Sequence, residues 1–136
     1  MRIKTVLETI KDRELPLIKE DKTIKEVLEK MLQYPHTRLV YVIDKNGFYK
    51  GTISLERLVT HLFPYCFEPD IVPRSLIPVI TAKSAKDIMN KGLVYATKED
   101  TVDEVIHRMI RADSNEIAVL NDKKKVVADV TMLDLL

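Results

Sequence analysis

Residues 23–28 read Thr23-Ile24-Lys25-Glu26-Val27-Leu28, and residues 101–106 repeat this pattern, 78 positions later, as Thr101-Val102-Asp103-Glu104-Val105-Ile106. In both stretches apolar residues continue at the spacing i, i+3, i+4, i+7 and i+8, which places them on one face of an α-helix. Each stretch opens with Thr-x-x-Glu, a capping box in which the two side chains satisfy free amides at the start of a helix. The repeat therefore predicts equivalent helices over residues 24–32 and 102–110 and an internal duplication of the chain.

The residues that follow each helix extend the duplication. A short polar loop leads into an apolar run, residues 39–43 in the first copy and 117–120 in the second, and such continuous runs predict strands covered on both faces. A turn comes next, and Asn46-Gly47 marks it as a hairpin in the first copy because both residues tolerate positive φ. The remaining predicted elements are leading helices at 3–11 and 84–90, second strands at 49–53 and 126–130, and second helices that begin at 54 and 131.

These elements define the expected fold class and domains. We expect an α/β (α+β) fold of two tandem β-α-β-β-α repeats that share a core, since half of this pattern cannot bury its sheet alone. The first repeat with its leading helix would span residues 1–62, and the second with its own leading helix would span residues 84–136. Residues 63–83 hold four of the six prolines. We interpret them as a connector that packs on a surface, because many of its side chains are apolar.

The composition of the 136-residue chain indicates its compartment and argues against two classes of partner. The net charge of +1 and the interleaving of basic and acidic residues argue against a nucleic-acid ligand. No apolar run approaches the roughly 20 residues that span a bilayer, which argues against insertion into a membrane. The single cysteine, Cys66, cannot form an internal disulfide, and together with the lack of a signal-peptide core it predicts a cytoplasmic protein.

The reactive side chains match no catalytic or metal motif. The three histidines, His36, His61 and His107, are scattered, and neither His-Glu-x-x-His nor Cys-x-x-Cys occurs. With three glycines, the chain has no glycine-rich phosphate loop. We therefore expect no catalytic residues, no metal site and no required cofactor, and we predict that the protein is not an enzyme.

A known family has the same ordered set of elements in duplicate. The two β-α-β-β-α copies, the Gly-x-x-Ser/Thr-x-x-Asp pattern at the last strand–helix junction and the leader Ser84-Ala85-Lys86-Asp87-Ile88-Met89 resemble a cystathionine-β-synthase (CBS) domain pair, also called a Bateman module. The resemblance implies repeats packed with pseudo-twofold symmetry and two clefts between them. Such clefts commonly bind AMP, ADP, ATP or S-adenosylmethionine, so a regulatory, ligand-sensing function is implied. The resemblance also implies a homodimer and a regulated protein partner or fused domain.

In the second copy the resemblance assigns ligand binding to the tetrad Thr131-Met132-Leu133-Asp134. The Asp134 carboxylate would accept hydrogen bonds from the ribose hydroxyls, and Thr131 would lie near the phosphates. Thr-x-x-Asp is also an ordinary helix cap, and both roles can coexist. Across the cleft, Arg38 is either the phosphate partner or a solvated loop arginine. The other residues implied for this nucleotide site are Asp129, Thr37, Leu39, Leu93 and Val94.

The first copy departs from the family pattern. Its tetrad Ser54-Leu55-Glu56-Arg57 keeps the hydroxyl but places Arg57 where the family has the acid, and a guanidinium cannot accept from ribose hydroxyls. This degenerate second cleft, with Ser54, Arg57 and Thr52, is expected to hold no ligand, an anion or a ligand bound differently. A plain surface position is the favoured interpretation of Arg57.

The second copy departs too, because Ala128 replaces the glycine seen at Gly51 and Asp129 occupies a strand position that is usually apolar.

Three functions are therefore open. The leading hypothesis is a sensor of an adenosine ligand. A ligand-free dimerisation or scaffolding module is favoured by Arg57 and Ala128. A divalent-cation-responsive regulatory domain of a transporter is favoured by the acids Glu68, Asp70 and Asp129.

Overall fold

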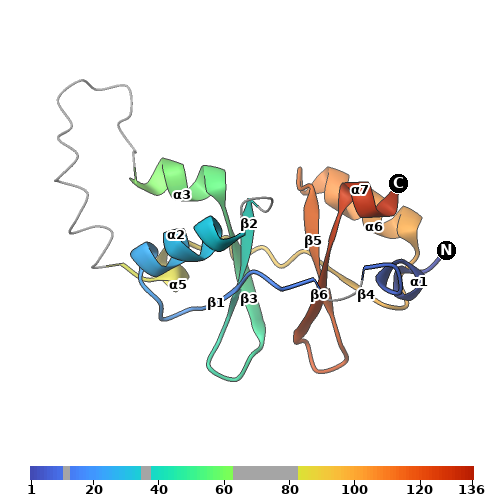
Figure 1. Cartoon of the computed structure of the whole chain (residues 1–136), viewed down its shortest axis with the longest axis horizontal. Helices are drawn as coiled ribbons and strands as arrows, with labels where there is room; N and C mark the ends of the chain where they lie inside the picture. The colour runs from blue at the N-terminus through green and yellow to red at the C-terminus, as the bar shows by residue number, and fades with distance from the viewer. Residues whose placement is uncertain (11–12, 35–37, 63–82) are drawn as a thin grey trace. The chain divides into compact units, whose positions relative to one another are not determined.

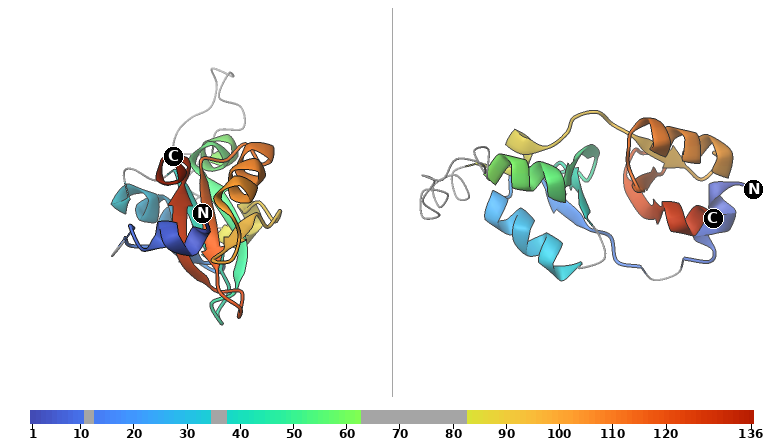
Figure 2. Two further views of the ribbon diagram at one scale, coloured as in Figure 1. Left: turned by 90° about the vertical axis from the view of Figure 1, so that its right-hand side faces the viewer. Right: turned by 90° about the horizontal axis from the view of Figure 1, so that it is seen from above.

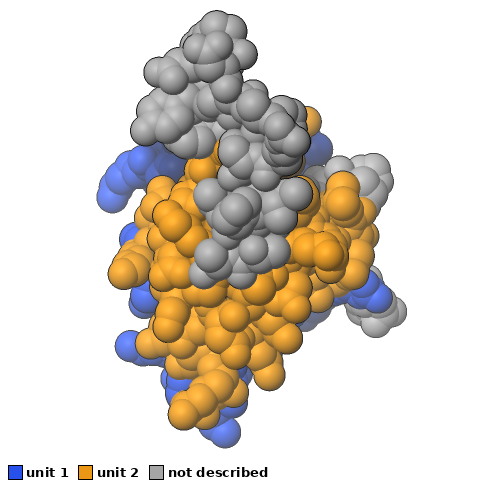
Figure 3. Space-filling view, turned by 90° about the vertical axis from the view of Figure 1, so that its left-hand side faces the viewer, with its two compact units in different colours: residues 1–15, 47–49, 92–136 blue, residues 16–46, 50–91 orange. Residues whose placement is uncertain are grey.

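The computed structural model describes residues 1–10, 13–34, 38–62 and 83–136 (Figure 1). The chain forms two compact units, coloured separately in Figure 3. Unit 1 comprises Met1–Leu15, Gly47–Tyr49 and Gly92–Leu136, and unit 2 comprises Pro16–Asn46 and Lys50–Lys91. Each unit contains a three-stranded sheet with helices packed on it, and this mixed α+β architecture confirms the predicted fold class.

The sheet of unit 2 has the strand order β1-β2-β3. β1 (Leu17–Lys19) runs parallel to β2 (Leu39–Ile43), and β3 (Tyr49–Ser54) lies on the other side of β2. A parallel pair needs a crossover connection, which α2 (Ile24–Gln33) provides. α3 (Leu55–Leu62) follows β3 and lies beside α2 along the sheet (Figures 1 and 2). The core between the helices and the sheet includes Val27, Met31, Val40, Val42, Ile53 and Leu58.

Unit 1 repeats this arrangement with the strand order β4-β5-β6. β4 (Tyr95–Thr97) is parallel to β5 (Glu116–Leu120), and β5 is antiparallel to β6 (Val126–Thr131). The crossover helix is α6 (Val102–Arg111), and the last helix is α7 (Met132–Leu135). Consecutive residues of β2 and of β5 are buried, as their continuous apolar sequences predict. The core of unit 1 includes Ala96, Val105, Met109, Ile117, Val119 and Val130.

Each leading helix packs on the sheet of the other repeat. α1 (Ile3–Leu7) adds its apolar side to the core of unit 1, whereas α5 (Ala85–Ile88) adds its apolar side to the core of unit 2. The compact units therefore cut across the predicted boundaries 1–62 and 84–136, and both helices are shorter than predicted. Helices of one turn are unstable alone, so their position is decided by the core that accepts their apolar side.

Equivalent backbone hydrogen bonds hold the two leading helices. In unit 2, Ala85 N donates to Lys22 O over 2.7 Å. In unit 1, Ile3 N donates to Asp100 O over 2.9 Å. Both bonds join the first residue of a leading helix to the residue just before the capping threonine of the crossover helix. The duplication found in the sequence thus extends to hydrogen bonds between distant parts of the chain.

Both predicted capping boxes form. Thr23 Oγ1 accepts from Glu26 N over 3.2 Å, and Thr23 N donates to Glu26 Oε2 over 2.9 Å. Thr101 and Glu104 make the same two bonds at 3.3 and 3.1 Å. These caps begin the two longest helices of the described residues, α2 and α6, at ten residues each. Over the described ranges, no helix has the length and apolar character needed to cross a membrane.

The predicted hairpin turn is also present. Gly47 has a φ of 88°, and Asn46 N donates to Asp44 Oδ1 over 2.9 Å. The second copy makes its turn without a glycine, because Lys124 adopts a positive φ of 60° at the equivalent position. Asn121 supports that turn, since its Oδ1 accepts from the amide of Lys123 over 2.9 Å.

Candidate ligand site

Thr131 and Asp134 form another capping box, at the junction of β6 and α7. Thr131 Oγ1 accepts from Asp134 N over 3.3 Å, and Asp134 Oδ2 accepts from Thr131 N over 2.8 Å. The helix-cap interpretation of Thr-x-x-Asp is therefore confirmed. The cap holds the carboxylate near the surface of unit 1, where the Asp134 side chain is 17% exposed.

Arg13, which sequence reasoning did not identify, makes a two-pronged ion pair with Asp134. Arg13 Nη1 donates to Asp134 Oδ2 over 2.8 Å, and Arg13 Nη2 donates to Asp134 Oδ1 over 3.0 Å. The bonds from Arg13, and after them the amide of Thr131, hold the pKa of Asp134 below its ordinary value, although burial opposes them. The hydrogen bond to Asp134 also raises the pKa of Arg13. The two partners are 121 residues apart, and no sequence motif links them.

Asp129 lies next to this ion pair. It is on β6 opposite Ala118 of β5, and only 5% of it is exposed. Its Oδ1 lies 4.0 Å from Arg13 Nη1 and accepts no hydrogen bond from the described residues. Burial, and after it the charge of Glu116, raises the pKa of Asp129 to about 6, which Arg13 opposes. The structure thus brings together three predicted site residues, Asp129, Thr131 and Asp134, and adds Arg13.

At the position equivalent to Asp134, unit 2 has a basic residue, Arg57. Ser54 Oγ accepts from Arg57 N over 3.0 Å, so the hydroxyl caps α3 as Thr131 caps α7. The Arg57 side chain donates through Nε to Ile88 O and through Nη2 to Met89 O, the latter over 3.4 Å. Arg57 is exposed, as the favoured interpretation has it, but its guanidinium also binds carbonyls at the end of α5.

The backbone closes in around the same region of unit 2. Thr52 N donates to Asn90 O over 3.1 Å, and Asn90 N donates to Thr52 O over 2.7 Å. A Cβ added at Gly51 would lie 2.4 Å from Asn90 O. The segment after α5 therefore packs against β3 at a position where only glycine leaves room. The Arg57 side chain binds the carbonyls of Ile88 and Met89, at the end of α5. No carboxylate acceptor for ribose hydroxyls is present among Thr52, Ser54 and Arg57.

The other predicted site residues belong to separate places. Arg38 O accepts from Leu55 N over 2.8 Å, so its backbone supports the start of α3, and Leu39 begins β2. Leu93 is 48% exposed, and Val94 packs partly buried on the core of unit 1; both residues precede β4. Thr37 lies outside the described residues. The approach of Arg38 to Asp134 stays a prediction, since the two residues belong to different units.

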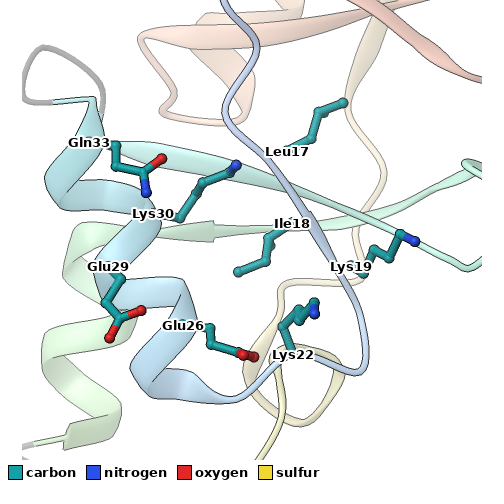
Figure 4. A pocket seen from close by; sticks show the side chains of 8 residues that line it. All are labelled: Leu17, Ile18, Lys19, Lys22, Glu26, Glu29, Lys30 and Gln33. Carbon is teal, nitrogen blue, oxygen red and sulfur yellow. The ribbon is translucent and has the colours of Figure 1, made fainter.

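A shallow groove of about 460 Å³ lies between β1 and α2 in unit 2 (Figure 4). The lysines Lys19, Lys22 and Lys30 and the glutamates Glu26 and Glu29 project around it (Figure 4). Glu26 already belongs to the capping box of α2. Because the lining has charges of both signs and the glutamate Glu26 is committed to the helix cap, the groove offers no concentrated charge for an ionic ligand.

The described residues contain no group of three or more histidine, cysteine, aspartate or glutamate side chains that could hold a metal ion. Two of the acids that favoured a cation site, Glu68 and Asp70, lie outside the described residues, as does Cys66. His61 is on α3, and burial lowers its pKa.

The chain matches a known protein family and a solved structure with the same fold. The CBS domain family model matches residues 7–64 and again residues 85–136. A CBS domain-containing protein from Thermotoga maritima is 26% identical, with a TM-score of 0.77, over 99% of this chain and 91% of that chain. None of the curated proteins matches the chain.

Two further solved structures share the fold at lower identity. One is a CBS domain pair in complex with 5′-methylthioadenosine and S-adenosyl-L-methionine, at 17% identity and a TM-score of 0.71, over 99% of this chain and 92% of that one. The other is the cytosolic domain of the Mg²⁺ channel MgtE in complex with ATP, at 24% identity and a TM-score of 0.66, over 88% of this chain and 42% of that one. Because the family model matches both repeats and covers well over half of the sequence, the chain belongs to the CBS domain family.

Proposed function

We propose that this protein is a regulatory, ligand-sensing module that binds an adenosine-containing ligand through Asp134 and catalyses no reaction. The observation that carries the proposal is the partly exposed Asp134 carboxylate, held at the β6–α7 junction by its bonds with Thr131. A carboxylate can accept from both vicinal hydroxyls of a ribose, and such charge-assisted bonds are strong. Solved structures with this fold bind ATP, S-adenosylmethionine and 5′-methylthioadenosine, which supports the same ligand class here.

The contrast between the units supports a single ribose site. Unit 1 offers an acceptor at Asp134, whereas unit 2 has a donor, Arg57, at the equivalent position. Arg57 is also engaged with the end of α5. We therefore assign the ligand to the acidic position and a structural role to the basic one. The contribution of Thr37, Arg38, Leu39, Leu93 and Val94 to this site stays a prediction from the family resemblance.

Thermal unfolding with AMP, ADP, ATP and S-adenosylmethionine tests the proposal. A ligand present at 100 times its dissociation constant should add about 2.7 kcal/mol to the free energy of unfolding. Asp134→Ala should abolish this gain, measured against the melting temperature of the variant itself because the substitution also removes a helix cap.

Arg57→Ala is the matched control, since it changes the equivalent position of the other repeat. It should leave the ligand-induced shift unchanged while lowering the melting temperature of the free protein. A shift that survives Asp134→Ala but disappears in Arg57→Ala would reverse the assignment. The absence of a shift with every nucleotide would contradict the proposal.

We also propose a homodimer. Leu32 on α2 and Ile110 on α6 occupy equivalent positions in the two repeats, and they are 73% and 63% exposed. Two large apolar side chains in matching places suit a symmetric interface with a second copy of the chain. A cytoplasmic location and a regulated protein partner or fused domain complete the proposed function.

A further inference from the structure

The Asp134 carboxylate has too few acceptor positions to hold Arg13 and a ribose together. It accepts from Arg13 Nη1, Arg13 Nη2 and Thr131 N, which makes three N–H donors. A carboxylate offers about four acceptor positions, and two vicinal hydroxyls need two of them. The bond from Thr131 N belongs to the helix cap. A ribose that binds Asp134 must therefore displace at least one of the bonds from Arg13.

A second acceptor for Arg13 lies beside the first. Asp129 Oδ1 is 4.0 Å from Arg13 Nη1 and accepts no hydrogen bond from the described residues. A normal N–H···O bond spans about 2.7–3.2 Å, so a shift of about 1 Å would complete one. A buried carboxylate oxygen without a hydrogen bond is costly, and such a bond would remove that cost. Asp129 is 5% exposed, so water compensates it little.

The charges around Asp129 favour this shift. Glu116 on β5 and Asp134 on α7 both raise the pKa of Asp129, and Arg13 is the cation that lowers it. When ribose hydroxyls bind Asp134, the guanidinium of Arg13 loses hydrogen bonds there but remains next to an ionised, buried carboxylate. Arg13 is 38% exposed, which leaves it room to move.

From this geometry we infer that Arg13 is a two-position switch, which pairs with Asp134 as in the structure and moves to Asp129 when ligand hydroxyls bind Asp134. Asp129 is then a positioning residue of the site, because it stabilises the displaced arginine without touching the ligand. The ligand step rests on the proposed function, whereas the preference of Arg13 for the two carboxylates is a property of the ligand-free protein. The two parts can therefore be tested separately.

The first test needs no ligand. Asp134→Asn removes the charged partner of Arg13, so Arg13 should move to Asp129. The proton affinity of the Asp129 carboxylate should then fall about tenfold. The carboxyl pKa of Asp129 is followed by ¹³C NMR in the wild type, in Asp134→Asn, in Arg13→Gln and in the double variant. The loss of the Asp134 charge alone also lowers this pKa, and the change from Arg13→Gln to the double variant measures that effect. A clearly larger fall when Arg13 is present supports the switch, and an equal fall overturns it.

The second test uses adenosine as the probe, because it has no phosphate that titrates in the same pH range. Binding should release a proton from Asp129, since the arriving arginine lowers its pKa. The affinity should therefore rise about threefold between pH 5.5 and pH 7.5 in the wild type. Both Arg13→Gln and Asp129→Asn should bind adenosine with no such rise. A rise that persists in both variants overturns the switch. If Asp134→Ala binds adenosine as tightly as the wild type, the proposed function is overturned, and the NMR experiment alone then tests the switch.

Discussion

Burial and the charges of Glu116 and Asp134 all raise the pKa of Asp129. The folded protein holds the pKa of this group at about 6, against an ordinary value of 3.8. Between these values the folded state binds more protons than the unfolded state, so the free energy of unfolding falls as the pH rises. Asp134 behaves oppositely, because its pKa is lowered by Arg13 and its contribution to stability is lost in acid.

Asp129→Asn should therefore raise the free energy of unfolding at pH 7.5, by up to about 3 kcal/mol, and leave it nearly unchanged at pH 4. Urea denaturation at the two pH values measures both quantities. Asp134→Asn is the control, and it should lower stability at pH 7.5 because the two-pronged ion pair with Arg13 and the charged cap of α7 are lost. A variant Asp129→Asn that is less stable than the wild type at pH 7.5 would show that the carboxylate is compensated after all.

At the scale of elements, the two repeats differ where the last strand meets its neighbours. Gly51 on β3 faces the segment after α5 so closely that a Cβ would lie 2.4 Å from Asn90 O and 3.1 Å from Met89 Sδ. The equivalent residue on β6 is Ala128, so unit 1 tolerates the extra carbon. The difference reflects the leading segment, which pairs with β3 through backbone bonds between Thr52 and Asn90.

Gly51→Ala should lower the free energy of unfolding by about 1–3 kcal/mol, because backbone atoms and not a flexible side chain must move. Ala128→Gly is the matched control in the other repeat, with an expected loss of about 0.5–1 kcal/mol from backbone entropy. Chemical denaturation of both variants checks the difference. If Gly51→Ala were neutral, the contact between β3 and the end of α5 would not be a tight one.

At the scale of the whole molecule, the proposed dimer makes Leu32 and Ile110 the residues to test. Leu32→Glu and Ile110→Glu should each raise the dimer dissociation constant at least about tenfold, since a charge would enter an apolar interface. Sedimentation velocity over a range of concentrations measures the change. Val127→Glu, at a 40% exposed position on β6, is the control and should leave the dimer intact. A dimer unaffected by both helix variants would place the interface elsewhere.

The sequence by itself determined the duplicated elements, because their causes are local. Helix spacing and Thr-x-x-Glu boxes predicted α2 and α6 with their caps, and apolar runs predicted β2 and β5. The cap made by Thr131 and Asp134 joins residues three positions apart and could be predicted for the same reason.

Only the tertiary structure decided what those elements contact. The partner of Asp134 is Arg13, 121 residues away, and the partners of Arg57 are carbonyls about 30 residues further along the chain. The same holds for the short helices α1 and α5. Their apolar pattern does not indicate which sheet they cover, and the core that buries their apolar side chains decides it. Such contacts join segments that are far apart in the sequence, and a local pattern cannot relate them. Packing, charge and the space left by a glycine decide between the possible partners only once the chain has folded.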